Sequence, residues 1–456
     1  MAKYQAYTEY KDSGVEWLGE IPRHWDSKPL KYLCTYNDEV LPETTAKDAE
    51  IQYIDIGSVS AVDGISKIET MIFKDAPSRA RRIVRDGDVI VSTVRTYLEA
   101  IAPINNPPEN LIVSTGFAVI RPNQYLYKSF ASYCLRAKGF IKEVVARSVG
   151  VSYPAINSSD LVNIAIPSIE YVEQVKIANF LDHETAQIDS LIAKQEKLIE
   201  LLKEKRQAVI SHAVTKGLDP NVPMKDSGVA WLGEVPEHWK IMKLGIAVFM
   251  QEGPGLRTWQ FTDSGTRVIC VTNITEDGIN FSKLEKFIST SEYIQSYQHF
   301  TVNKGDVLLS SSGNSWGKIA TYDDDELVIL NTSTIRLNEL PSKIIDQNYI
   351  RYILSSISTR EQLGLMMTGS CQPNFGPSHL KEVKVMVPPI HEQTKIINAI
   401  QEIIVKFDNL INKADKQISL MQERRTALIS AAVTGKIDVR NWQAPTVTEA
   451  DTELSA

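Results

Sequence analysis

The chain has 456 residues, of which 43% are hydrophobic and 23% charged, a composition typical of globular proteins that excludes a wholly disordered chain. Lys and Arg number 49 and Asp and Glu number 56, so the formal charge of −7 argues against a protein that coats nucleic acid through overall positive charge. It does not exclude a specific DNA reader with local basic loops.

The four cysteines, Cys34, Cys134, Cys270 and Cys371, lie far apart in sequence and form neither a CxxC pair nor a zinc-binding pattern. We expect small buried thiols in a reducing compartment, the cytoplasm. No run of about 18 apolar residues occurs, so we expect no membrane span. No signal peptide is visible near the start.

The first element in chain order is a Trp-rich motif, Lys11–Trp25, which occurs twice. Twelve of its fifteen positions recur in Lys225–Trp239, 214 residues further on. A second match pairs Lys205–Thr215 with Arg424–Thr434, 219 residues apart. The chain therefore consists of two copies of one unit, each with a Trp-rich motif, a variable globular stretch and a long helix. The first motif occupies residues 1–26.

Residues 27–168 are predicted to form a mixed α/β domain. Short strands are expected at Ile51–Ile56, Asp88–Ser92 and Phe117–Arg121, and a helix at Tyr125–Lys138. Polar loops between these elements carry side chains suited to DNA, because arginine can bond guanine bidentately and serine suits phosphates. The candidate DNA contacts are Arg79, Arg81, Arg82, Arg95, Tyr97, Ser152 and Tyr153.

A long helix is predicted within residues 169–239, a region that ends with the second Trp-rich motif. Between Gln187 and Ala213 apolar residues recur at steps of three, four and seven, the spacing of a coiled-coil seam. Gly217 can end this helix. The expected seam residues are Ile188, Leu191, Ile192, Leu198, Ile199, Leu202, Val209 and Ile210.

Residues 240–388 are predicted to form a second mixed α/β domain, with strands at Arg267–Thr272, Asp306–Ser310 and Leu327–Leu330 and a helix at Asn348–Leu363. Asn and Gln side chains can bond adenine bidentately. The candidate DNA contacts here are Arg257, Trp259, Gln260, Ser312, Asn314, Trp316, Lys318, Ser370, Gln372 and Asn374. Because the two globular stretches share little sequence, we expect them to recognise different things.

A second long helix is predicted within residues 389–440, and Gly435 can end it. Its seam, in the same register as the first, contains Phe407, Leu410, Ile411, Ile418, Met421 and Leu428. A helix of about 27 residues spans roughly 40 Å and needs a partner for its apolar side. The simplest partner is the other helix, in an antiparallel intramolecular coiled coil with pseudo-two-fold symmetry. Alternatively, each helix packs on its own globular domain. We expect no fixed structure over residues 441–456.

Motifs of catalysis are incomplete. Asn106–Glu109 resembles the Asn-Pro-Pro-aromatic loop of adenine methyltransferases, but its final Glu cannot stack on a flipped base. Gly313–Ile319 is one residue short of a phosphate loop and lacks its metal-binding Ser or Thr. His24 and His238 recur within the Trp-rich motifs, where we expect capping or packing. The sequence therefore predicts no catalytic residue and no metal site.

The sequence resembles, over nearly its whole length, the DNA-specificity subunit of type I restriction–modification systems. The resemblance rests on the doubled SGVxWLGExPxHW motif, the Gly-Asp-Val strands, the segment Gly369–Leu380 and the helix ends RQAVISHAVTKG and RRTALISAAVTGK. The first copy departs from the usual Gly-x-x-Gln-Pro loop, because Tyr153 stands where the second copy has Gln372. A shared base contact from that position is therefore in doubt.

The resemblance implies an α+β fold with two mixed α/β target recognition domains joined by two long antiparallel helices. Each domain would read one half of a bipartite, asymmetric DNA site. The helices would act as a ruler for the gap and as a scaffold for two modification subunits, which methylate adenine. The implied partners are double-stranded DNA, these methyltransferase subunits and, optionally, restriction/translocase subunits in a prokaryotic cytoplasm, with no membrane. No cofactor is expected on this chain, whereas S-adenosylmethionine, ATP and Mg are expected on the partner subunits.

The residues leave two other functions open. A protein–protein scaffold with two protein-binding heads would suit the acidic charge, but the basic and amide-rich loops count against it. A self-contained nuclease or methyltransferase would need the motifs that are incomplete. Binding to randomised duplexes with and without the partner separates the scaffold from the DNA reader, and methyl transfer by the chain alone would support an enzyme.

Overall fold

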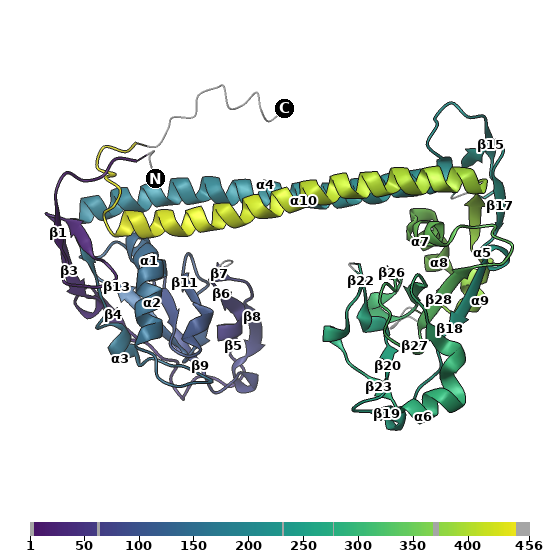
Figure 1. The fold of residues 1–456 in the computed structure, drawn as a ribbon. Coiled ribbons are helices and arrows are strands. Elements are labelled where there is room, and N and C mark those ends of the chain that lie inside the picture. Colours follow the sequence, from purple (N-terminus) through teal and green to yellow (C-terminus); the bar gives the residue numbers. More distant parts are fainter. Residues whose placement is uncertain (1–3, 62–63, 230–231, 277, 368–373, 444–456) are drawn as a thin grey trace. The chain divides into compact units, whose positions relative to one another are not determined.

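The structure is a computed structural model that describes residues 4–61, 64–229, 232–276, 278–367 and 374–443 (Figure 1). Its internal contacts divide the chain into two compact units, one of Met1–Gln195 with Lys416–Ala456 and one of Glu196–Asp415. The division falls within the two long helices, α4 (Tyr171–Lys216) and α10 (Ile390–Val433). Each unit therefore contains the first part of one long helix and the last part of the other.

The first unit holds two four-stranded sheets. One has the order β11-β10-β13-β4 and the other the order β8-β5-β12-β9. The strands of the first sheet are β4 (Cys34–Tyr36), β10 (Val89–Ser92), β11 (Ile101–Pro103) and β13 (Phe117–Pro122). Those of the second are β5 (Glu50–Ile54), β8 (Glu69–Ile72), β9 (Ala80–Ile83) and β12 (Leu111–Ser114). The remaining elements are β1 (Tyr10–Asp12), β2 (Glu20–Pro22), β3 (Asp26–Pro29), β6 (Val59–Ser60), β7 (Gly64–Ile65), β14 (Ala165–Ser168), α1 (Lys128–Arg136), α2 (Lys138–Ala146) and α3 (Ser158–Leu161).

The second unit repeats this arrangement with sheets of order β18-β28-β25-β26 and β19-β23-β20-β27-β24. The first sheet contains β18 (Val248–Glu252), β25 (Val307–Ser310), β26 (Ile319–Thr321) and β28 (Thr334–Glu339). The second contains β19 (Phe261–Thr262), β20 (Thr266–Ile269), β23 (Phe287–Ile288), β24 (Thr301–Val302) and β27 (Val328–Leu330). The other elements are β15 (Met224–Asp226), β16 (Glu234–Pro236), β17 (Lys240–Lys243), β21 (Ile274–Thr275), β22 (Gly278–Ile279), β29 (Lys384–Val387), α5 (Leu244–Ala247), α6 (Thr290–Glu292), α7 (Gln347–Ser355), α8 (Ile357–Met366) and α9 (Pro377–Glu382).

The two units share a topology although their globular stretches share little sequence. Strand β10 lies between β11 and β13 as β25 lies between β26 and β28. Each second sheet contains one parallel pair, β5 with β12 and β20 with β27. The predicted α+β fold with an internal repeat is confirmed.

Two predicted strands end earlier than expected. Strands β5 and β20 stop at Ile54 and Ile269, because a 3-10 turn follows each of them within two residues. The single helix expected at Asn348–Leu363 was wrong, since Ser356 is extended and separates α7 from α8. The Ser356 hydroxyl accepts a hydrogen bond from the backbone N–H of Thr359, which caps the new helix start.

The long helices pack antiparallel along a heptad seam. In the first unit Asp189 of α4 pairs with Arg425 of α10 at 2.9 Å, while Lys176 donates to the carbonyl of Arg440. The seam consists of buried and half-buried positions that step by four and three, as a coiled coil requires. They are 188, 192, 195, 199, 202, 206 and 209 on α4, and 404, 407, 411, 414, 418, 421, 425 and 428 on α10.

Three leucines assigned to the seam from the sequence lie outside it. Leu191, Leu198 and Leu410 are exposed, because each stands one position before a seam residue and therefore about 100° away around the helix. Polar residues Gln195 and Arg206 occupy seam positions instead, and Ala414 was missed.

A glutamate–glutamine pair attaches the start of each long helix to its unit. Glu173 accepts hydrogen bonds from Tyr7 and Trp25, and His24 lies 3.1 Å from its second oxygen. Burial and the Glu173 contact raise the pKa of Tyr7 far above its usual value. Gln174 bonds the backbone of residues 125, 127 and 169.

The second unit repeats this attachment. Glu392 bonds Trp239 at 3.1 Å and His238 at 2.8 Å. Gln393 bonds the backbone of residues 344, 346 and 388. His24 and His238, for which capping or packing was expected, are both about half exposed, and each contacts the glutamate that attaches its helix.

Each helix end packs on the Trp-rich motif of its own structural unit. Gly435 ends α10 with a φ of 72°, and a Cβ there would fall 2.2 Å from Pro22. Gly217 ends α4 with a φ of 82° beside the Trp239 ring. The first motif therefore holds the second helix, so the structural unit combines pieces of both sequence repeats.

The described cysteines are buried. Burial raises the pKa of Cys34 to about 12 and that of Cys134 well above its usual value. Cys270 is also buried, whereas Cys371 lies outside the described residues. Within the described segments, no helix combines the length and the apolar character needed to cross a membrane.

Candidate nucleic-acid interface

The predicted contacts of the first unit gather mainly in two loops. We name residues 93–99 and 148–156 the first loop cluster. Val94 and Ala155 form a β-bridge, and the N–H of Ile156 donates to the carbonyl of Thr93 at 2.9 Å. The hydroxyls of Thr96 and Ser148 lie 2.8 Å apart. These contacts hold the loop that follows β10 against the loop that follows α2.

The first loop cluster presents Arg95, Tyr97, Ser152 and Tyr153 on its surface, and all four are exposed. The Arg95 guanidinium lies 5.1 Å from the centre of the Tyr153 ring, a cation–π contact. No hydrogen-bond acceptor contacts the Arg95 guanidinium among the described residues. Its donors are therefore open to a ligand.

The other predicted arginines have partners or are partly buried. Arg79 donates to the Tyr53 hydroxyl and pairs with Asp55 at 2.9 Å, and these contacts raise its pKa. Arg81 lies over the Phe73 ring at 4.8 Å. Arg82 is half-buried, which lowers its pKa. Arg79 is linked to the first loop cluster indirectly. Its carbonyl accepts a hydrogen bond from the N–H of Thr115, and the carbonyl of the next residue, Gly116, accepts one from the N–H of Thr93.

The second unit has an equivalent cluster after β25. We name residues 311–318 and 374–376 the second loop cluster. Ser312 and Asn374 form a β-bridge, and the N–H of Phe375 donates to the carbonyl of Ser311 at 3.1 Å. Asn314 and Asn374 are exposed, while Ser312, Trp316 and Lys318 are half-buried. Ser370 and Gln372, two further predicted contacts, lie outside the described residues.

The remaining predicted contacts lie on the loop between β18 and β19. Arg257 is exposed and Trp259 is 79% exposed. Gln260 is only 8% exposed and its amide bonds Arg257 N–H, Glu292 and Tyr297. Gln260 thus stabilises this loop, and its buried amide is not part of the candidate interface.

The turns of the two clusters have the same backbone but different residues. Arg95 and Glu99 adopt the left-handed conformation at φ 50° and 53°, where the second turn has Gly313 and Gly317 at 61° and 75°. The equivalence follows from matching contacts, since Ser92 N–H donates to Ala100 and Ser310 N–H to Lys318. Left-handed backbone disfavours residues with a Cβ by roughly 1–2 kcal/mol.

The sequence analysis did not identify two residues that belong to or support the loop clusters. They are Glu99, a left-handed residue of the first loop cluster, and Glu252, which lies behind the second. The signal for Glu99 was the match between Gly87-Asp-Val and Gly305-Asp-Val, which aligns it with Gly317. Glu252 accepts from the N–H of Ser333, whose carbonyl accepts from the N–H of Ser311 in the second loop cluster. No sequence signal marks that contact, because β18 and β28 become neighbours only through folding.

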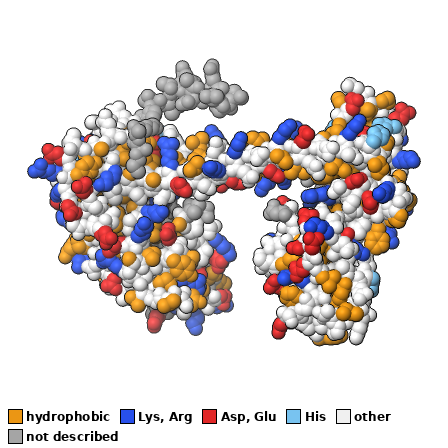
Figure 2. Space-filling view, viewed as in Figure 1, with side chains coloured by type: hydrophobic (Ala, Val, Ile, Leu, Met, Phe, Trp, Pro, Cys, Tyr) orange, Lys and Arg blue, Asp and Glu red, His pale blue; other side chains and the backbone are white. Residues whose placement is uncertain are grey.

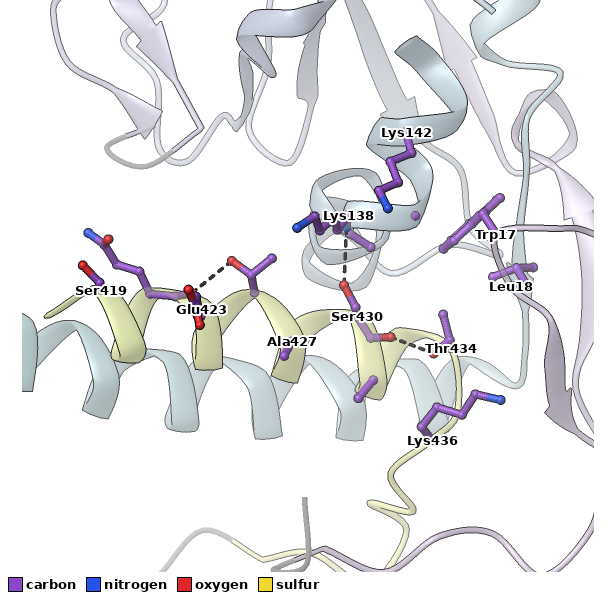
Figure 3. Close-up of a pocket in the computed structure, with 15 residues that line it drawn as sticks. Trp17, Leu18, Lys138, Lys142, Ser419, Glu423, Ala427, Ser430, Thr434 and Lys436 are labelled. Carbon is purple, nitrogen blue, oxygen red and sulfur yellow. Dashed lines mark hydrogen bonds between the residues drawn. The ribbon is translucent and has the colours of Figure 1, made fainter. Parts of the chain in front are cut away.

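A separate groove of about 900 Å³ lies in the first unit, along one side of α10. Figure 3 shows Ser419, Glu423, Ser430 and Thr434 of α10 on its wall, with Lys138 and Lys142 opposite. The Ser430 hydroxyl accepts from the N–H of Lys138 at 3.4 Å. The groove shares no residue with the first loop cluster, so it is not part of the candidate interface.

The described residues show neither a metal-binding group nor a phosphate loop at Gly313–Ile319. They contain no group of three or more His, Cys, Asp or Glu side chains placed to hold a metal ion. Gly313–Ser315 forms a 3-10 turn that leads into strand β26 rather than a helix, so it lacks the helix N-terminus on which a phosphate loop depends.

Comparisons with known proteins agree with this arrangement. Residues 22–201 and 236–420 match the family model of the type I restriction modification DNA specificity domain. The type I restriction enzyme MjaVIII specificity subunit of Methanocaldococcus jannaschii is 26% identical over 338 residues, which cover 73% of this chain and 76% of the relative. The putative MjaX specificity subunit of the same organism is 25% identical over 452 residues, which cover 96% and 99%.

A solved chain from a study of complex assembly and conformational transition in the type I R-M system shares the fold, with a TM-score of 0.67 at 19% identity. The match covers 91% of this chain and 99% of the solved one. The family assignment rests on the specificity domain, which matches twice and covers most of the chain. This chain therefore belongs to the type I restriction–modification specificity subunits, the non-catalytic DNA-specificity components of a multisubunit enzyme.

Proposed function

We propose that this subunit reads a bipartite, asymmetric DNA site, one half through each loop cluster. The observation that carries the proposal is that the two units share a strand order, whereas their loop clusters expose different side chains. The first loop cluster offers Arg95 and two tyrosines, whereas the second offers Asn314 and Asn374. Because arginine favours guanine and asparagine favours adenine, two such surfaces favour different base sequences.

The test is methylation mapping in cells that carry this chain and its modification partner. The expected result is one methylated motif made of two short, different sequences separated by an unread gap. Cells with the modification subunit alone are the control and should lack the motif. A single continuous motif, or methylation without sequence preference, would contradict the proposal.

We propose that α4 and α10 set the length of the gap. The support is that both helices are continuous and bury a heptad seam in each unit. Inserting four residues into both helices should add about 6 Å, or one to two base pairs at about 3.4 Å each. The motif should keep both halves and lengthen only its gap. A changed half-site with an unchanged gap would overturn this role.

We propose that two copies of the modification subunit dock on the helices. The support is a pair of exposed leucines in each unit, Leu191 with Leu420 and Leu201 with Leu410. Each pair contains one leucine from each helix, and the pairs match when the repeats are aligned. Figure 2 shows apolar side chains among mixed charges along α4 and α10. Exposed apolar residues in a repeated pattern suit two identical partners.

The docking test measures how many modification subunits bind. Leu191→Glu with Leu420→Glu should remove one subunit from the complex, and Leu201→Glu with Leu410→Glu the other, as seen in the complex mass. Lys194→Glu, on the charged side of α4, is the control. If both double variants still bind two subunits, the leucines do not form the docking surface.

The proposed partners bring the chemistry. We propose that this chain binds no cofactor, that methyltransferase subunits hold S-adenosylmethionine and that optional restriction/translocase subunits bring ATP and Mg. The complex would act on double-stranded DNA in a prokaryotic cytoplasm. Methyl transfer by the purified chain alone would contradict this division of roles.

A further inference from the structure

The turn that follows β10 uses long charged residues where its counterpart uses glycine. Arg95 and Glu99 occupy left-handed positions that Gly313 and Gly317 fill in the second unit. Nothing lies within 4 Å of a Cβ placed on Gly313, so the difference is not a matter of space. Since glycine adopts this conformation without steric cost, the backbone gives no reason for an arginine there. A side chain kept at a strained position points to a role for that side chain.

The Arg95 side chain is oriented rather than paired. Its guanidinium lies over the ring of Tyr153, which is itself 67% exposed. In contrast, Arg79 and Arg85 in the same unit are held by Asp55 and Glu39. Stacking on an aromatic face leaves the edge of the guanidinium, with its donors, directed outward in one plane. That edge matches the two acceptors of guanine in the major groove.

We propose that Arg95, oriented by Tyr153, reads a guanine in the half-site bound by the first loop cluster. This inference rests on the proposed function. It also gives Tyr153 its own role: the tyrosine that replaces Gln372 supports the base-reading residue and makes no base contact. The second loop cluster, with glycine at the equivalent position, reads no base from there.

The experiment uses the full chain assembled with its modification subunits and measures competition among duplexes that differ at one base pair at a time. Arg95→Gly keeps the left-handed backbone and removes the reader. It should reduce discrimination about 10- to 100-fold at one G·C pair of one half-site and leave the other half-site unchanged. Arg95→Lys should behave similarly, because an ammonium group cannot form the planar fork.

Variants of Tyr153 separate support from contact. Tyr153→Phe keeps the ring and should leave discrimination unchanged, whereas Tyr153→Ala should weaken it at the same G·C pair as Arg95→Gly. Asn106→Gly is the matched control, because Asn106 is also exposed and left-handed but lies after β11 at the other end of β10. It should change no base preference. Thermal unfolding verifies that each variant is folded.

Two results would overturn the inference while leaving the proposed function intact. One is an Arg95→Gly complex that discriminates like wild type at every position, or loses discrimination at an A·T pair. The other is uniform weakening on all sequences with a smaller salt dependence, the sign of a phosphate contact. If the wild-type complex itself prefers no sequence, the proposed function fails instead.

Discussion

The first and second loop clusters follow equivalent strands, β10 and β25, and close through equivalent hydrogen bonds. Their exposed side chains nevertheless differ: arginine and tyrosine in the first, asparagine in the second. The backbone contacts that fix the loops therefore do not depend on the residues that we propose to contact DNA. Such a framework allows recognition to change without a change of fold, because most of the contacts that stabilise the turn are backbone hydrogen bonds.

The glutamate attachments of the two units differ in depth. The Glu173 side chain is 10% exposed and has three partners, whereas Glu392 is 23% exposed and has two. This difference gives the largest effect that we expect. Glu173→Ala should lower the free energy of unfolding by about 3 kcal/mol and Glu392→Ala by about 2 kcal/mol, because hydrogen bonds to a charged group contribute about 1.5–3 kcal/mol.

Hydrogen exchange measured by peptide separates the two effects, since the units need not unfold together. The protection lost in Glu173→Ala should concentrate around Tyr7, Trp25 and the start of α4. That lost in Glu392→Ala should concentrate around Trp239 and the start of α10. If both variants lost the same free energy of unfolding, Tyr7, the third hydrogen-bond partner of Glu173, would add no stability.

Recognition by the second loop cluster is the next largest effect. Asn314→Ala should cost about 1–3 kcal/mol of discrimination at one A·T pair of the half-site bound by the second unit. The reason is that the Asn314 amide is exposed and has no hydrogen-bond partner within the described part of the chain. The measurement is competition binding on single-substitution duplexes. Loss at the half-site that depends on Arg95 would mean that the two clusters do not divide the site.

The left-handed turns give a smaller, reciprocal effect on stability. Gly313→Ala should lower the free energy of unfolding by about 1 kcal/mol, because the new Cβ strains the backbone. Arg95→Gly should change it by less than about 0.5 kcal/mol, since relief of strain offsets the greater freedom of glycine in the unfolded chain. Denaturant unfolding of both variants checks the comparison. A large loss for Arg95→Gly would imply that Arg95 stabilises the fold.

The smallest expected effect concerns the ion pairs between the helices. Asp189–Arg425 in the first unit and Arg206–Asp408 in the second occupy matching repeat positions. Each is partly exposed, so Asp189→Asn and Asp408→Asn should each cost about 0.5 kcal/mol and less at high salt. Thermal unfolding at two salt concentrations measures this. A much larger cost in one unit would break the equivalence of the two helix halves.

The sequence allowed much of the architecture to be predicted, because repetition and periodicity are local signals. The heptad steps predicted the paired helices, and Gly217 and Gly435 marked their ends. The exposed Leu191 and Leu410 were assigned to the seam because steps of three and four also describe a neighbouring stripe. Only packing of one helix on the other selects between adjacent stripes.

The candidate interface was predicted less completely. Arg95, Tyr97 and Tyr153 were identified as loop residues with suitable chemistry. The contact between Arg95 and Tyr153, however, joins two loops more than fifty residues apart in sequence. Gln260 had the same chemistry and proved to be buried by Glu292 and Tyr297. Residue type alone cannot separate these cases, since exposure depends on neighbours that are distant in sequence.

The sequence by itself determined that the chain is a duplicated protein with two unlike globular stretches, two amphipathic helices and incomplete catalytic motifs. The tertiary structure decided how these parts combine. The first Trp-rich motif packs on the end of α10, and the second packs on the end of α4. One unit therefore contains residues from both ends of the sequence. The physical reason is that a periodic pattern in the sequence indicates only which side of a helix is apolar. The element that packs against that side, and the residues that surround each loop, are determined only when the whole chain packs.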